Sequence, residues 1–83
     1  MDDLIDAGDF DKPVRVEIGA RELDVYSTLQ AAEMLMYDWP IGETGARMEA
    51  RMTCMKVLGG SEPPETARKA FTKAAKEADI LAC

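Results

Sequence analysis

The chain has 83 residues, of which 47% are hydrophobic and 31% charged, and its formal net charge is −6. This length and composition are typical of one small globular domain. The chain has no histidine, and this removes the side chain that most often serves as acid–base catalyst and as metal ligand. No stretch approaches the ~18 uncharged apolar residues of a membrane span. The acidic start MDDLIDAGDFD lacks the positive charge of a signal peptide, so we expect a cytoplasmic protein.

The first twelve residues carry five aspartates and little apolar material. We expect residues 1–12 to form a mobile acidic arm in front of a single domain at 13–83, with Phe10 anchoring the arm to that domain. A calcium loop built from neighbouring aspartates is not expected, because the glycine and the closing glutamate of an EF-hand are not at the required spacing.

Residues 14–18 and 21–26 alternate apolar and polar side chains, and this pattern predicts two β-strands. Gly19-Ala20 between them suits a type II′ hairpin turn, which would place Val14 opposite Val25 and Arg15 opposite Asp24. The same register places two glutamates opposite each other, so a four-residue loop stays an alternative. Both registers give the same inner face: Val14, Val16, Ile18, Leu23 and Val25.

A first helix is predicted after the hairpin. Ser27-Thr28-Leu29-Gln30 fits a capping box in which the Gln30 side chain reaches back, and Pro40 ends the helix near Tyr37 or Asp38. The apolar spacing predicts a buried face of Leu29, Ala32, Leu35, Met36 and Trp39. A lone tryptophan at a helix end usually closes the core, and a recognition hot spot is the alternative for Trp39.

A second helix is predicted from about Gly45 to Leu58, between Thr44 as its cap and Gly59-Gly60 as its end. Its apolar residues cover more than half of the circumference, so we expect the most buried helix of the domain, with Cys54 as a small buried hydrophobe. Met48, Met52 and Met55 lie at i, i+4 and i+7. Core packing is the first interpretation of this stripe, and an adaptable partner groove is the second.

Ser61-Glu62-Pro63-Pro64-Glu65 opens a third predicted helix. An apolar stripe of small residues follows at helical spacing: Ala67, Ala70, Phe71, Ala74, Ala75 and Ala78. On the other side Lys69, Lys73 and Lys76 lie beside Arg68 and form a basic face. We expect a solvated face with a Glu65–Lys69 ion pair, and a surface for an anionic partner is the alternative. Ile80 and Leu81 are predicted to fold back onto the core.

The order of strand, strand, helix, helix, helix predicts an α+β fold, with a ββααα arrangement in which one hairpin face packs on the helices. A hairpin alone leaves unpaired backbone groups on both edges. We therefore expect a homodimer in which two hairpins join edge to edge.

The sequence carries no constellation for catalysis. GxSxG and GxxxxGK[ST] motifs are missing, and Cys54 has no histidine to activate it. We expect no catalytic residue, cofactor or metal. The predicted function is a non-enzymatic protein-interaction or regulatory domain that self-associates, with Trp39, Lys69, Lys73 and Lys76 as candidate partner-binding residues. A nucleic-acid-associated regulator that uses the basic face is the alternative, although the net negative charge makes it unlikely.

The order of several short motifs resembles a known family. These are the hairpin, Ala31-Ala32, Trp39-Pro40, Ala67-Arg68-Lys69-Ala70-Phe71 and the segment 74–78. Together they are similar to the domain of unknown function 982 family, whose short members are common in rhizobia and related alphaproteobacteria. The resemblance covers about residues 13–80 and implies a bacterial, cytoplasmic, single-domain protein. It brings no activity or site residue, and Asp79 stands where we expect glycine in many relatives.

Overall fold

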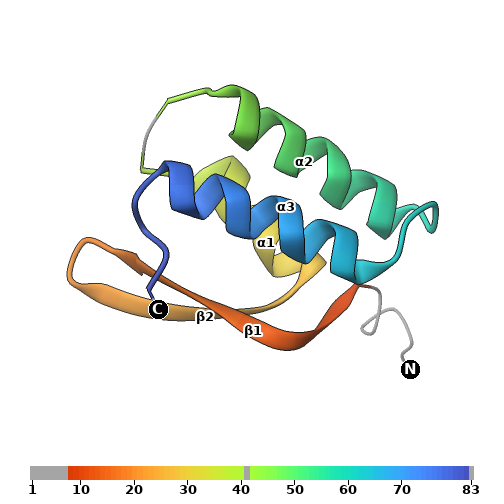
Figure 1. The fold of residues 1–83 in the computed structure, drawn as a ribbon, viewed down its shortest axis with the longest axis horizontal. Coiled ribbons are helices and arrows are strands. Elements are labelled where there is room, and N and C mark those ends of the chain that lie inside the picture. Colours follow the sequence, from red (N-terminus) through yellow and green to blue (C-terminus); the bar gives the residue numbers. More distant parts are fainter. Residues whose placement is uncertain (1–7, 41, 83) are drawn as a thin grey trace.

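The computed structural model describes residues 8–40 and 42–82, which form one hairpin and three helices (Figure 1). Strands β1 (Asp9–Ile18) and β2 (Arg21–Ser27) are followed by helices α1 (Thr28–Tyr37), α2 (Gly45–Leu58) and α3 (Pro64–Glu77). The predicted α+β fold, a hairpin followed by three helices, is confirmed.

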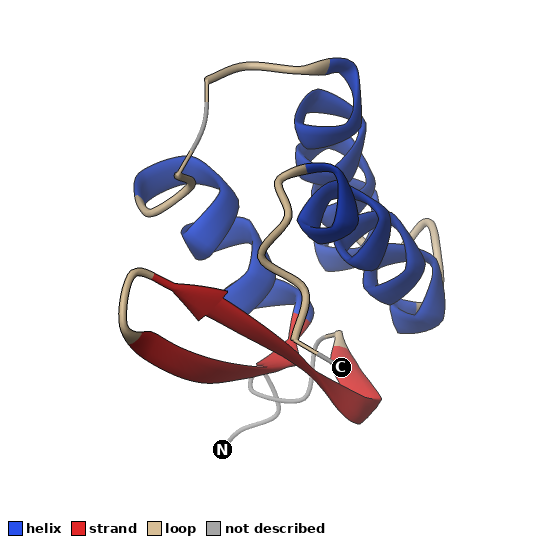
Figure 2. Ribbon diagram, turned by 60° about the vertical axis from the view of Figure 1, so that its left-hand side comes forward, coloured by secondary structure: helices blue, strands red, loops and turns tan. Residues whose placement is uncertain are grey.

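The elements are stacked in layers. Helix α3 packs on β1 and α1 packs on β2, whereas α2 packs on α1 and α3. Figures 1 and 2 show α2 on the side of the other two helices that faces away from the hairpin. Helix α2 therefore has one buried side and a broad outer side.

Of the two registers that the sequence left open, the hairpin has the one with the two-residue turn. Gly19 has a positive φ of +64°, whereas the φ of Ala20 is not positive. A positive φ at the first turn residue alone is the pattern of a type II′ turn. Val14 lies opposite Val25 and Arg15 opposite Asp24. On the inner face the three valines are buried, and Ile18 and Leu23 pack partly buried against the core.

The first strand begins earlier than we predicted. Residues 9–12 belong to β1 rather than to a mobile arm, and residues 1–7 lie outside the described part of the chain. Asp9 pairs with Ser27 across the hairpin, after an irregularity in the ladder between Asp9 and Val14. Phe10 packs partly buried against the core, as expected. Strand pairing thus orders residues whose composition alone suggested disorder.

Both edges of the hairpin are partly covered from within the chain, so the prediction of two open edges is wrong. After α3 the chain returns to β1, where the Glu17 amide donates to the Ile80 carbonyl at 2.7 Å and the Ala82 amide donates to the Arg15 carbonyl at 2.9 Å. Figure 2 shows this return onto the sheet. On β2 the side-chain amide of Gln30 donates to the Asp24 carbonyl at 3.2 Å, and its oxygen accepts from the Tyr26 amide at 2.8 Å.

The core is built around the alanine-rich face of α3. Phe71, Leu35 and Val16 are the largest fully buried side chains. The predicted stripe is confirmed, because Ala67, Ala74 and Ala75 are buried and Ala70 and Ala78 pack partly buried beside them. Ile80 is also buried, which confirms the predicted return of the C-terminal segment.

The predicted buried face of α1 is partly wrong: Leu35 is buried and Ala32 and Trp39 pack partly buried, as predicted, but the face is rotated away from Leu29 and Met36. The structure buries Thr28, Ala31, Met34 and Leu35, and leaves Leu29 and Met36 exposed. Helix α1 begins with Ser27 as its cap, as predicted: the Ser27 hydroxyl accepts from the Gln30 amide at 3.1 Å. The cause of the shift is Thr28, whose hydroxyl is buried and donates to the Gly8 carbonyl at 2.7 Å.

The prediction that α2 is the most buried helix is also wrong. Its ends are as expected: Thr44 caps the start, and Gly60, with a φ of +88°, follows the end. Only Ala50, Cys54 and Val57 are buried. An apolar circumference permits burial on any side, and the outer position of α2 leaves the methionine side in solvent.

Candidate functional site

Five of the six exposed large hydrophobic side chains of α1 and α2, all except Tyr37, are leucine or methionine side chains. We call them the methionine surface: Leu29, Met36, Met48, Met52 and Met55. Their exposed fractions lie between 46% for Met48 and 70% for Met55. The core interpretation of the methionine stripe is thereby corrected.

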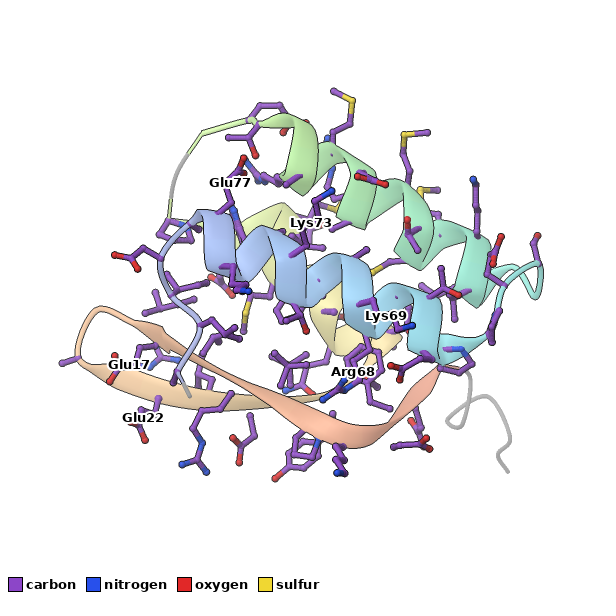
Figure 3. The ribbon with its side chains drawn as sticks, in the orientation of Figure 1. Glu17, Glu22, Arg68, Lys69, Lys73 and Glu77 are labelled. Carbon is purple, nitrogen blue, oxygen red and sulfur yellow. The ribbon has the colours of Figure 1, made fainter. Side chains whose placement is uncertain are left out.

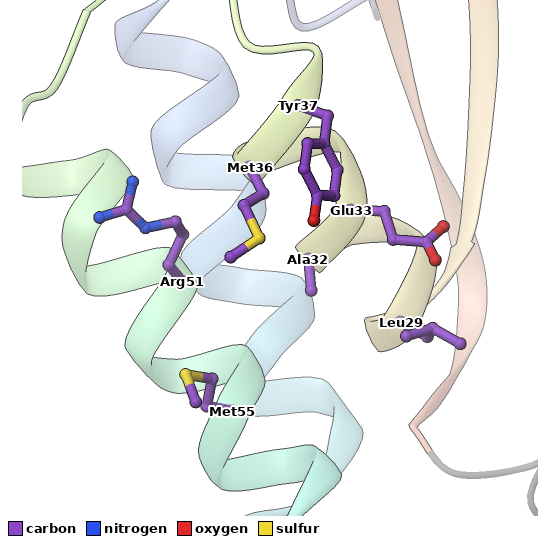
Figure 4. A pocket seen from close by; sticks show the side chains of 7 residues that line it. All are labelled: Leu29, Ala32, Glu33, Met36, Tyr37, Arg51 and Met55. Atoms are coloured by element: carbon purple, nitrogen blue, oxygen red, sulfur yellow. The ribbon is translucent and has the colours of Figure 1, made fainter.

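A groove between α1 and α2 joins part of this surface. Leu29, Ala32 and Met36 line it from α1, and Met55 lines it from α2 (Figure 4). The hollow has a volume of about 270 Å³. The charged groups Glu33 and Arg51 lie at its two sides, so the groove has an apolar floor and polar rims.

The geometry of α2 continues the apolar surface beyond the groove. Residues at i, i+4 and i+7 share one side of a helix, so Met48, Met52 and Met55 form one stripe. By the same periodicity Ala50, Cys54 and Val57 lie on the opposite side, which packs on α1 and α3. Methionine side chains are flexible and polarisable, and they adapt to partners of different shape.

The Arg47 side chain of α2 joins the two helices that carry the groove, whereas Arg51 binds the connection between them. The Arg47 guanidinium donates to the Leu35 carbonyl at 2.6 and 2.9 Å. This carbonyl lies in the last turn of α1, where no further helical amide can bind it. Arg51 forms a two-point pair with Glu43 at 2.9 and 3.0 Å. Beside the groove, the Arg47 side chain therefore ties α2 to the last turn of α1.

Sequence reasoning placed the methionine stripe correctly on one side of α2 and missed the α1 half of the site. The helical spacing of Leu29 and Met36 with Leu35 predicts a core position for both, and the structure exposes them instead. Arg47 and its bond to the Leu35 carbonyl left no signal in the sequence, because the bond joins residues from two helices.

The predicted basic face lies on α3. Lys69, Lys73 and Lys76 are exposed, and with Arg68 and Thr72 they line a shallow hollow. The predicted Glu65–Lys69 ion pair is wrong, since Glu65 lies 3.7 Å from Arg68 instead.

Acidic side chains interrupt this basic face. Lys73 lies 3.8 Å from Glu49 of α2, and Glu77 accepts a hydrogen bond from the Thr44 hydroxyl at 2.6 Å. Figure 3 shows Glu77 on the same helix as Arg68, Lys69 and Lys73. The guanidinium of Arg68 turns toward β1, where it donates to the Lys12 carbonyl at 3.0 Å. The structure therefore brings the lysines together without a broad positive surface.

Trp39 lies apart from both surfaces. Its ring is partly buried and packs edge-on against Phe71, with the ring centres 5.7 Å apart. The buried indole N–H has no hydrogen-bond partner among the residues described. Trp39 therefore helps to close the core beside α3.

Cys54 is not placed as a nucleophile. Its side chain is fully buried on the inner side of α2, and this burial raises the pKa of the thiol to about 11. A thiol with such a pKa carries almost no thiolate at neutral pH.

The described part of the chain offers neither a metal-binding cluster nor a membrane-spanning helix. No group of three or more histidine, cysteine or acidic side chains is placed to hold a metal ion there. Likewise, no helix between residues 8 and 82 has both the length and the apolar character needed to cross a membrane.

Comparisons with known proteins agree with the resemblance seen in the sequence. No curated protein and no solved structure matches the chain. The family described as "Protein of unknown function (DUF982)" matches residues 12–82, which include all three helices and nearly all of the hairpin. The chain therefore belongs to the DUF982 family, whose function is unknown.

Proposed function

We propose that this chain is a non-enzymatic protein-interaction domain of the bacterial cytoplasm that binds its partner through the methionine surface. The observation that carries the proposal is the exposure of Leu29, Met36 and Met55 around one groove. Large contiguous apolar patches on small soluble proteins usually mark an interaction site.

The shape and chemistry of the surface favour an apolar helix as the bound element. An amphipathic helix binds by laying its apolar side into a groove of this kind, with anchors at helical spacing. The charged side chains of Glu33 and Arg51 at the rim would orient the bound helix. The flexible methionine side chains would adapt to its shape.

Binding of nucleic acid through the basic face is the weaker candidate. Phosphate contacts need clustered and unpaired positive charge. Here Lys73 has Glu49 as a neighbour, and Arg68 is turned toward the Lys12 carbonyl. The net charge of −6 adds a general repulsion.

Affinity capture of the full chain from its native host tests the proposal. Met52→Asp places a charge in the methionine surface, and Lys69→Glu with Lys73→Glu is the matched change on the basic face. We expect the wild type and the lysine variant to retain the same bound proteins, and Met52→Asp to lose them. Loss in the lysine variant alone, or salt-dependent binding of DNA or RNA by the wild type, would contradict the proposal.

A further inference from the structure

We infer that the methionine surface binds a second copy of this chain, with the two α2 helices antiparallel about a two-fold axis near Met52. This inference rests on the proposed function and names the partner. It replaces the edge-to-edge hairpin dimer, because residues 80–82 and Gln30 already occupy parts of both hairpin edges.

The methionine stripe is suited to this symmetry. An isologous interface brings the same patch of both copies together, so a residue at one end of the stripe meets the residue at the other end. Met48 of one copy would face Met55 of the second, and the two Met52 side chains would meet at the axis. The stripe is therefore complementary to itself.

The charges beside the stripe are complementary in the antiparallel orientation. Glu49 follows Met48 and Lys56 follows Met55, so both charged residues lie on the same side of the stripe. In the antiparallel pair, Glu49 of each copy lies opposite Lys56 of the other, which gives two opposite-charge contacts. A parallel pair, whose two-fold axis runs along the helices, would place the two Glu49 side chains on opposite sides of the seam and would form neither of these Glu49–Lys56 contacts.

Both charges are available for contacts between copies. Lys56 is exposed and forms no ion pair within the described ranges 8–40 and 42–82. Glu49 has only a long contact of 3.8 Å to Lys73, and both side chains are largely in solvent. On the other side of the stripe Arg51 is neutralised by its two-point pair with Glu43, so it adds little repulsion near the axis.

A dimer of this small chain needs only a modest share of its exposed surface. A typical stable interface buries about 800 Å² on each partner, which is roughly 15% of the 5177 Å² that this chain exposes. The outer side of α2 together with Leu29 and Met36 of α1 offers an apolar centre for such an area. Charged residues then form its rim.

Sedimentation equilibrium of the full-length chain tests the arrangement through a charge swap. The wild type is expected to sediment as a dimer. Glu49→Lys and Lys56→Glu each create two like-charge contacts, and each should weaken the dimer by about tenfold. The double variant Glu49→Lys with Lys56→Glu restores opposite charges, so its dimer should return to near the wild-type strength. Circular dichroism of each variant checks that it is folded.

Two results would overturn the inference: a wild-type chain that is monomeric up to millimolar concentration, or a double variant that dimerises no better than the single variants. A monomeric wild type whose captured proteins are still lost on Met52→Asp would overturn the self-pairing alone. If Met52→Asp retained every protein that the wild type captures, the proposed function would be overturned instead.

Discussion

Thr28 and Gly8 are joined by two hydrogen bonds that close the base of the hairpin. Both the backbone amide and the hydroxyl of Thr28 donate to the Gly8 carbonyl, each at 2.7 Å. Gly8 precedes β1 and Thr28 begins α1, so these bonds hold the first strand to the first helix. Because Thr28 is fully buried, the pair also decides which side of α1 faces the core.

Gly8→Ala is expected to destabilise the domain by about 2–4 kcal/mol. Gly8 has a φ of +84°, and an added Cβ would overlap the Thr28 side chain. Gly42→Ala is the matched control, because a Cβ there meets no atom within 4 Å. Urea unfolding of both variants measures the difference, and equal stability of the two would contradict the role of the Gly8–Thr28 contact.

Phe71→Ala and Met55→Ala distinguish the core from the methionine surface. Phe71 is fully buried, so its truncation should cost about 3–5 kcal/mol, enough to unfold a domain of this size. Met55 is 70% exposed, and its truncation should change the free energy of unfolding of the monomer by less than ~0.5 kcal/mol. Thermal unfolding at low protein concentration checks both values. A large loss of stability in Met55→Ala would show that this side of α2 is buried.

Local signals in the sequence were enough to predict the elements and to narrow the hairpin to two registers. Gly19-Ala20 sets the register because a two-residue turn fixes which residues face each other. Thr44 and Gly59-Gly60 set the ends of α2 through capping. These features depend on residues close together in the chain.

The orientation of α1 and α2 could not be predicted in the same way. Both helices are apolar on more than one side, so periodicity does not say which side meets the core. The Thr28–Gly8 bonds set the rotation of α1 about its own axis. Helix α2 packs on α1 and α3 with one side only, so its outer side stays exposed. These contacts are long-range, and they are the reason that Leu29 and Met36 were missed as part of the candidate site.

Asp79→Gly is expected to stabilise the domain by about 0.5–1 kcal/mol. Asp79 follows the end of α3 with a φ of +61°, in the left-handed region that glycine adopts without strain. A raised midpoint in urea would confirm the strain at Asp79, whereas a lowered midpoint would show that its carboxylate supplies a compensating contact.

The Arg15–Asp24 pair predicts a shifted titration on the outer face of the hairpin. The Arg15 guanidinium, which donates to the Asp24 carboxylate at 2.8 Å, lowers the pKa of Asp24 below its ordinary value of 3.8. The pair therefore stabilises the folded state at pH values above the ordinary pKa of 3.8. This contribution is lost as the pH falls through the lowered pKa.

An NMR titration of the carboxyl groups measures this effect. Arg15→Gln removes the charge and should return the pKa of Asp24 toward its ordinary value. An unchanged Asp24 titration in Arg15→Gln would show that the pair does not form in solution.

The most direct test of the methionine surface is an NMR dilution series on the chain with labelled methionine methyl groups. If the surface is where this domain binds its second copy, the methyl resonances of Met48, Met52 and Met55 shift with protein concentration. The methyl resonance of Met34, which is buried in the core, stays constant. Resonances of Met48, Met52 and Met55 that do not change from micromolar to millimolar concentration would contradict the account.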